Sequence, residues 1–129
     1  MGTAATITLT AADFEQTVTG NDIVLVDFWA EWCGPCRRFG PVFEAVAEAN
    51  PDVVFGKVDT EEERRLSAAA GITSIPTLMA FRGGILVFAQ PGALPQPALE
   101  DLLSQVRALD MDQVRASVNA DADGGAAGS

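Results

Sequence analysis

The sequence contains no histidine, and this absence excludes several classes of enzyme. Ser-His-Asp hydrolases and Cys-His proteases use an imidazole as their general base. Catalytic zinc sites with histidine ligands, and pH switches that depend on imidazole protonation, need the same side chain. Tyrosine is absent as well. Any chemistry in this chain must therefore depend on other side chains.

Long apolar runs are also absent. A membrane-spanning helix needs roughly 20 predominantly apolar residues. The longest apolar-rich stretch covers only residues 23–30 and is interrupted by Asp27. Residues 1–5 show neither the basic region nor the apolar region of a signal peptide. We therefore expect no membrane association and a cytoplasmic location.

Positive charge is scarce in this chain. It has 8 Lys and Arg residues against 18 Asp and Glu residues, a formal net charge of -10. Phosphate backbones and anionic membrane surfaces both repel a protein this acidic. We therefore expect no nucleic-acid partner, and we interpret the charge as a source of solubility.

The length and composition suit one folded domain. Of the 129 residues, 48% are hydrophobic and 20% are charged, which is typical of a globular chain that buries its own core. Residues 121–129 contain only Asp, Ala, Gly and Ser, which predicts a disordered tail because nothing there can be buried. We place the domain at residues 1–110 and assign residues 111–129 to a helical extension that ends in this tail.

Apolar runs and helical periodicity alternate along the chain. They predict strands over residues 6–9, 23–30, 53–59, 77–81 and 85–89. Helices are predicted from an N-cap at Thr10 to residue 18, over residues 35–50, from a capping box at residues 60–63 to residue 70, and over residues 99–109. The turn at Gly83-Gly84 adds an antiparallel hairpin to a parallel core. The predicted fold is α/β, with a mixed sheet and helices on both faces.

The only two cysteines, Cys33 and Cys36, lie three residues apart. A zinc ion or an iron–sulfur cluster normally takes four ligands, so a metal would require a dimer that shares both pairs. A structural disulfide would close so short a loop that it adds little stability. A redox-active dithiol is therefore the leading interpretation, with two unrelated structural thiols as the alternative.

The position of the pair assigns a role to each sulfur. Pro35 suits the first turn of a helix, which places Cys33 at the helix N-terminus. Backbone N–H groups and the helix dipole there stabilise an anion, and we expect them to lower the pKa of the Cys33 thiol. Cys36 lies one turn into the helix and is expected to be shielded from solvent. We predict that Cys33 attacks and that Cys36 resolves the mixed disulfide.

Asp27 and Lys57 interrupt two otherwise apolar strands. Burial would raise the pKa of the Asp27 carboxyl, so that it could act as a base toward Cys36. The alternative is a solvated carboxylate at a strand end. If the two strands are neighbours, Lys57 could pair with Asp27, and the alternative for Lys57 is a side chain directed into solvent.

Two further positions favour special backbone geometry. Pro76 indicates either a rigid turn or a cis peptide bond, and its sequence context alone favours trans. Gly92 either permits a close approach of another backbone or is simply a turn glycine.

The run Val26-Asp27-Phe28-Trp29-Ala30-Glu31-Trp32-Cys33-Gly34-Pro35-Cys36 resembles the active-site signature of the thioredoxin family. The same resemblance includes Pro41, Asp59, Gly71, Ile75, Pro76, Thr77, Gly84, Gly92 and Ala93. It covers about residues 6–109 and is far more specific than a Cys-x-x-Cys spacing alone. It implies the thioredoxin fold, a central mixed five-stranded sheet flanked by four helices.

The resemblance also implies roles for individual residues. The catalytic group would comprise Cys33, Cys36, Asp27 and Lys57. The substrate-binding residues would be Trp32, Gly34, Pro35, Ile75, Pro76 and Gly92. Among these, Trp32, the backbone of Ile75 and Gly92 would form a peptide groove, and the bond before Pro76 would be cis.

The activity implied by the resemblance is that of a monomeric protein-disulfide reductase acting on disulfide-containing client proteins. Its partner would be a thioredoxin reductase, usually a flavoprotein that uses NADPH. We expect this chain itself to bind no cofactor and no metal, since no phosphate-binding glycine motif opens a helix in it. Its only redox group would be the Cys33–Cys36 disulfide.

Two other functions fit the same residues. A disulfide oxidant or isomerase would usually carry a histidine between the cysteines and an export signal. A non-catalytic binding module would hold partners through Trp32, Ile75 and Gly92 without using the thiols. Beside the site, Arg37 and Arg38 are expected to hold the thiolate, to meet acidic partners, or to form a solvated helix face.

Overall fold

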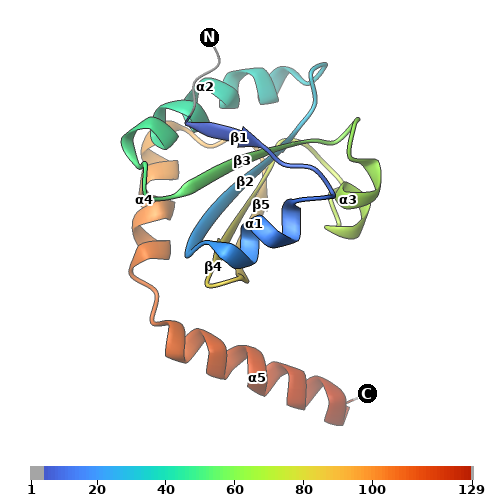
Figure 1. Ribbon diagram of the computed structural model, residues 1–129, viewed down its shortest axis with the longest axis vertical. Helices are drawn as coiled ribbons and strands as arrows, with labels where there is room; N and C mark the ends of the chain where they lie inside the picture. The colour runs from blue at the N-terminus through green and yellow to red at the C-terminus, as the bar shows by residue number, and fades with distance from the viewer. Residues whose placement is uncertain (1–4, 129) are drawn as a thin grey trace.

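The computed structural model describes the backbone of residues 5–128 and the side chains of residues 5–120. Within this part of the chain, five strands and five helices follow one another (Figure 1). In chain order they are β1 (Thr6–Thr8), α1 (Phe14–Gly20), β2 (Ile23–Trp29), α2 (Gly34–Ala49), β3 (Val54–Asp59), α3 (Arg64–Ala69), β4 (Thr77–Arg82), β5 (Ile85–Pro91), α4 (Gln96–Arg107) and α5 (Met111–Gly128).

The strands form one mixed sheet in the order β1-β3-β2-β4-β5. Strands β1, β3 and β2 run parallel, whereas β4 is antiparallel to β2 and β5 is antiparallel to β4. Strand β2 is central, and its residues from Ile23 to Phe28 are all buried. This confirms the mixed five-stranded sheet and explains the near-continuous apolar run, because a strand covered on both faces has no solvent side.

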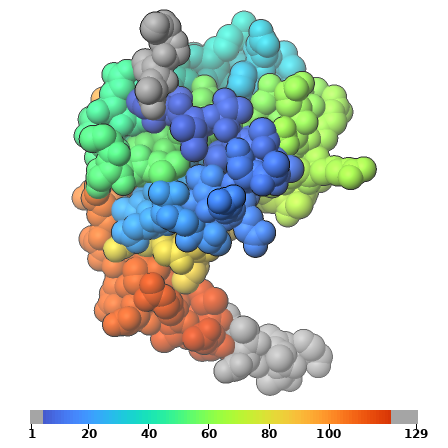
Figure 2. Space-filling model, in the orientation of Figure 1, coloured from blue at the N-terminus to red at the C-terminus, as the bar shows by residue number. Residues whose placement is uncertain are grey.

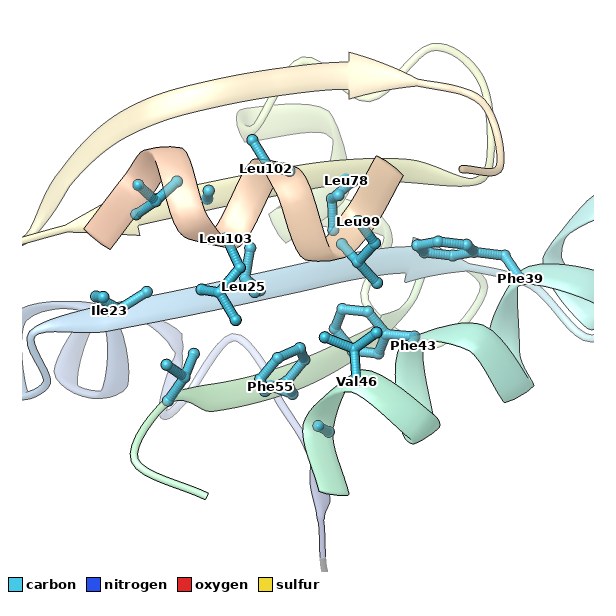
Figure 3. Close-up of a cluster of buried hydrophobic side chains, with 14 residues drawn as sticks. Ile23, Leu25, Phe39, Phe43, Val46, Phe55, Leu78, Leu99, Leu102 and Leu103 are labelled. Carbon is cyan, nitrogen blue, oxygen red and sulfur yellow. The ribbon is translucent and has the colours of Figure 1, made fainter. Parts of the chain in front are cut away.

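Helices α2 and α4 cover one face of the sheet. Their inward side chains pack against β2, β3 and β4 (Figure 3). The helix residues in this cluster include Phe39, Phe43, Val46, Leu99, Leu102 and Leu103, and the strand residues include Ile23, Leu25, Phe55 and Leu78. Alternate residues along β2 therefore point toward α2, which places Asp27 on the face that this helix covers.

Helices α1 and α3 cover the opposite face. Val24, Val26 and Phe28 point to this side and pack with Val18 of α1 and with Leu66 of α3. Both faces of β2 thus contribute to the core, and the strand that leads into Cys33 is held from both sides.

The turn between β4 and β5 has the predicted tight geometry. Gly83 and Gly84 have φ angles of 59° and 81°, and two consecutive residues with positive φ are typical of a type I′ hairpin. Gly71, with φ of 74°, follows α3 as the predicted stop residue.

The predicted start of α1 is wrong. The helix begins at Phe14 with Asp13 as its N-cap residue, and Thr10 is not the cap. Asp13 Oδ1 instead accepts hydrogen bonds from the backbone N–H and the hydroxyl of Thr10. The short polar side chain thus closes a turn before the helix, an alternative that aspartate readily offers the backbone.

The predicted capping box at residues 60–63 is also wrong. Helix α3 begins at Arg64, and its N-cap residue Glu63 makes no side-chain cap hydrogen bond. The backbone N–H groups of Glu61 and Glu62 donate instead to Asp59 Oδ1, at 2.9 and 3.4 Å. The side chain of Asp59 therefore bonds the turn before α3, and it does not cap the helix itself.

Helix α5 follows the four helices that flank the sheet, in the region expected as a helical extension. It extends away from the sheet at the lower end of the molecule (Figure 1), and residues 111–120 lie at the same end of the space-filling view (Figure 2). Its backbone continues through Gly128, which differs from the disordered tail expected from residue 121. None of the helices in the described chain is long and apolar enough to cross a membrane.

Candidate active site

Cys33 and Cys36 form a disulfide where β2 passes into α2. Cys33 is the N-cap residue of α2, and Pro35 lies in the first turn, as predicted. The backbone N–H of Cys36 donates to Cys33 Sγ at 3.2 Å. A sulfur in this position accepts one of the amide hydrogens that a helix N-terminus leaves without an internal partner.

The expected difference in exposure between the two cysteines is not found. Each is 4% exposed, because the disulfide holds both sulfurs against Ala30, Trp29 and Ile75. Burial in this oxidised form therefore does not distinguish the sulfurs. Their positions do, since Cys33 occupies the N-cap and Cys36 lies inside the helix.

The loop before β4 faces the disulfide. The Ile75–Pro76 peptide bond is cis, as the resemblance implies, and the trans bond favoured by local sequence alone is wrong. Tertiary contacts select the isomer here, and a local preference cannot report them. Cys33 Sγ lies 3.7 Å from the carbonyl oxygen of Ile75, so the backbone of this loop borders the reactive sulfur.

Gly92 joins the same loop from the end of β5. Its backbone N–H donates to the carbonyl oxygen of Pro76 at 2.8 Å. With φ of 107°, Gly92 adopts a conformation that other residues rarely adopt. No atom lies within 4 Å of a Cβ atom placed on Gly92, so of its two interpretations the structure supports a turn glycine and not a close backbone approach.

Trp32 projects from the site and is 66% exposed. Its indole Nε1 donates to Glu61 Oε2 at 3.3 Å, and Glu61 is also paired with Arg64 at 2.8 Å. Trp32 and Ile75 line a pocket of about 470 Å³ that extends toward α3. The other four residues predicted to bind substrate do not line this pocket, namely Gly34, Pro35, Pro76 and Gly92. The six predicted residues therefore do not form one cavity.

Asp27 is fully buried on the face of β2 that α2 covers. Neither of its carboxylate oxygens has a hydrogen-bond partner in the described part of the chain. Burial raises the pKa of Asp27 from 3.8 to about 7, and the positive charge of Lys57 partly opposes this rise. The alternative of a solvated carboxylate at a strand end is therefore wrong.

Lys57 is the neighbour of Asp27 in the parallel register of β2 and β3. Its ammonium nitrogen lies over the Trp29 ring, 5.0 Å from the centroid. Lys57 and Trp29 line a pocket of about 360 Å³ that also reaches Cys36 and Glu44. Lys57 and the second cysteine, Cys36, thus line the same pocket.

Two residues at the site were missed in the sequence. Trp29 supports Lys57, and Glu61 bonds Trp32. A signal for Trp29 exists, because residues two apart on a strand share a face, and Trp29 follows Asp27 by two. No comparable signal identifies Glu61, since its contact depends on how α3 is placed.

The site offers thiol–disulfide chemistry. Among the residues that the structure describes, no group of three or more His, Cys, Asp or Glu side chains is placed to hold a metal ion. The reactive groups that meet here are two sulfurs within bonding distance, a buried carboxyl and an ammonium group. Such a pair can exchange a disulfide with another molecule.

Comparison with known proteins is consistent with this chemistry. A family model described as thioredoxin matches residues 5–105. A Streptomyces coelicolor protein named "Putative thioredoxin 2" is 63% identical over 114 residues, which cover 88% of this chain and 85% of that protein. Thioredoxin from Alicyclobacillus acidocaldarius is 48% identical and covers 79% of this chain and 98% of its own.

Solved structures agree in fold. A mutant thioredoxin from Halobacterium salinarum superposes with a TM-score of 0.76 at 32% identity, covering 85% of this chain and 98% of its own. Oxidised mitochondrial thioredoxin 3 from Saccharomyces cerevisiae gives 0.72 at 31% identity, covering 78% and 95%. The family match, the relatives and the Cys33–Cys36 disulfide together show that this chain belongs to the thioredoxin family of protein-disulfide reductases.

Proposed function

We propose that Cys33 carries out the first step of client reduction. Its thiolate attacks one sulfur of a client disulfide, forming a mixed disulfide and releasing the other client sulfur as a thiolate. Cys36 then attacks the sulfur of Cys33, which releases the second client thiolate and leaves Cys33–Cys36 oxidised. Two electrons pass to the client. The observation that carries this proposal is the amide hydrogen bond from Cys36 to Cys33 Sγ at the start of α2.

Asp27 serves as the base for the second step in this proposal. A pKa of about 7 makes the carboxyl roughly half ionised near neutral pH, which suits both taking and returning a proton. The proton of the Cys36 thiol goes to Asp27, and Lys57 stabilises the carboxylate from the neighbouring strand. The pocket that reaches both Cys36 and Lys57 gives water access to this exchange.

The client segment lies across the exposed face of the site. Trp32 supplies an exposed apolar surface, and the carbonyl of Ile75 supplies a hydrogen-bond acceptor beside Cys33. Pro76 and Gly92 shape the loop that presents this carbonyl, while Gly34 and Pro35 form the turn between the two cysteines. An extended segment fits such an edge because its backbone N–H groups can pair with it.

We further propose that a thioredoxin reductase restores the dithiol with electrons from NADPH, and that the chain works as a monomer in the cytoplasm without a bound cofactor. Cytoplasmic conditions keep thiols reduced, which fits a reductant of client disulfides. The catalytic unit in this proposal is the domain of residues 1–110. Its support is the family match, which ends at residue 105.

The other two functions are not favoured. A binding module has no use for a Cys33–Cys36 disulfide, and the relatives are named as thioredoxins. A double Cys33→Ser and Cys36→Ser variant distinguishes a binding module from a reductase. A binding module would keep its function in this variant, and a reductase would lose it.

A trapping experiment tests the order of attack. Cys36→Ser leaves the first step intact and blocks the second, so covalent complexes with a disulfide client should accumulate through Cys33. Cys33→Ser is the matched control and should trap little. Equal trapping by both variants would overturn the assigned roles. Reduction of insulin disulfides with NADPH and a thioredoxin reductase tests the complete cycle.

A further inference from the structure

Two arginines beside the disulfide differ from most of the other cations of this acidic chain. Arg37 and Arg38 are exposed on α2, and neither makes an ion pair with any described side chain. By contrast, four other arginines pair with carboxylates, namely Arg64, Arg82, Arg107 and Arg115. Two unpaired guanidinium groups therefore lie together, directly after the second cysteine of a protein with net charge -10.

The sequence of α2 explains why these arginines are unpaired. On a helix, ion pairs form between residues three or four apart. Three and four residues after Arg37 stand Gly40 and Pro41, and Pro41 and Val42 stand at the same distances after Arg38. The residues three positions before them are Gly34 and Pro35. The helix thus offers no carboxylate partner to either guanidinium.

Both guanidinium groups remain close to the reactive turn. Arg38 folds back so that its Nη1 would lie 3.9 Å from a Cβ atom placed on Gly34. Arg37 lines the pocket that contains Cys36 and Lys57. The positive groups therefore border the Cys33–Cys36 turn on its α2 side.

The opposite side of the site carries negative charge. Glu31 is exposed next to Trp32. Glu61 bonds the Trp32 indole and is partly neutralised by Arg64. Two carboxylates thus lie on the side of Trp32 and two guanidinium groups on the side of α2, where Glu44 lines the same pocket as Arg37.

We propose that Arg37 and Arg38 form a docking subsite for an acidic side chain of the client, so that the protein favours disulfides whose cysteine is flanked by Asp or Glu. The proposal rests on the reductase function proposed above and adds a partner chemistry to it. A guanidinium group presents several N–H donors that match a carboxylate. Because the protein as a whole repels anions, a preference for acidic clients requires a local positive group such as this pair.

Three matched peptides test the proposal. Each is a blocked five-residue peptide with a central cysteine, used as its intermolecular disulfide, and the cysteine is flanked on both sides by Asp, Asn or Lys. The fully reduced protein is mixed with each peptide at low ionic strength, and released thiol is followed by chromatography. Each second-order rate constant is divided by that of dithiothreitol with the same peptide, which removes the peptide's intrinsic reactivity.

The wild-type protein should show a higher normalised rate with the Asp peptide than with the Lys peptide. Exposed ion pairs contribute modestly, so Arg37→Gln and Arg38→Gln should each lower the Asp-to-Asn rate ratio by about two- to threefold. Arg65→Gln is the matched control, since Arg65 is an exposed arginine that lines neither pocket at the disulfide. It changes the net charge equally and should leave the ratio unchanged.

Other outcomes overturn the proposal. Equal loss of rate with all three peptides would show that the arginines act on the thiolate and not on the client. An equal fall in the ratio for Arg65→Gln would show that only net charge matters. Failure of the wild-type protein to reduce even the Asn peptide would instead contradict the reductase function, so the two failures are distinguishable.

Discussion

Asp27 and Lys57 are register neighbours on β2 and β3, yet no hydrogen bond to either Asp27 oxygen exists within the described residues. The ammonium group of Lys57 lies instead over the ring of Trp29. Lys57 therefore acts on the carboxyl through space, and it lowers a pKa that burial has raised. This arrangement leaves the carboxyl able to gain or lose a proton near neutral pH.

Replacement of Lys57 by Met should raise the pKa of Asp27 above about 7. The substitution removes the charge that favours the carboxylate and leaves the desolvation in place, so an upward shift of about half a unit to one unit is expected. The side-chain carboxyl carbon of Asp27, followed by NMR over pH 5 to 10, measures the shift. Lys57→Arg keeps the charge and should keep the midpoint near its wild-type value. An unchanged midpoint in Lys57→Met would show that the two groups do not interact.

Asp27 should reduce the stability of the folded protein at neutral and alkaline pH. Its folded-state pKa is about 7 against an ordinary 3.8, so the folded state holds the proton more tightly than the unfolded state. The free energy of unfolding is therefore highest below pH 4 for this group, falls as pH rises from about 4 to 7, and then levels off. Full ionisation costs about 4 kcal/mol by this shift.

Asp27→Ala removes that dependence. Urea unfolding at pH 4 and pH 8 should show the variant gaining stability relative to the wild type between the two values, by up to about 4 kcal/mol. The comparison uses the change with pH, so the constant cost of the cavity left by the smaller side chain cancels. A difference between the proteins that stays the same at both pH values would contradict the raised pKa.

The sequence predicts this fold well where the burial pattern is strong, and less well at helix starts. The run that forms β2 is apolar because both of its faces are covered, and the Gly83-Gly84 turn has a conformation that glycine adopts readily. The starts of α1 and α3 were misplaced because the side chains of Asp13 and Asp59 bond turns before the helices. Several polar residues compete for such bonds, and local spacing does not decide among them.

At the site, too, the features with a local sequence signal were predicted and those that depend on tertiary contacts were not. The Cys33–Cys36 pair and the burial of Asp27 follow from a reactive spacing and from a charge inside an apolar strand. The contact of Lys57 with Trp29 depends on which strands are neighbours and on their register. The equal burial of the two sulfurs depends on packing around Ile75. These features arise from contacts between distant segments, which sequence periodicity does not describe.

Helix α5 should contribute little to the stability of the domain. Its contacts near the sheet include Met111 and Arg115, which lie beside Gly83, while Val118 is 44% exposed. A chain that ends at Asp110 should lose no more than about 1 kcal/mol of unfolding free energy and should reduce insulin disulfides at the wild-type rate. Urea denaturation and the coupled NADPH assay measure both quantities. A loss above about 3 kcal/mol would place α5 within the folded domain and contradict the boundary at residue 110.

Gly56 is expected to be essential for the packing of β1 against β3. A Cβ atom at this position would lie 2.8 Å from Leu9 Cγ and closer still to Cδ1, and Leu9 is only 1% exposed. Gly56→Ala should therefore destabilise the protein by about 1 to 3 kcal/mol, because a packed core has no room for the extra methyl group. Gly20→Ala is the matched control, since no atom lies within 4 Å of its Cβ position, and it should be neutral or slightly stabilising. Combining Gly56→Ala with Leu9→Val should recover part of the loss in urea denaturation. Purely additive effects of these two substitutions would show that the leucine is not the group with which the new methyl collides.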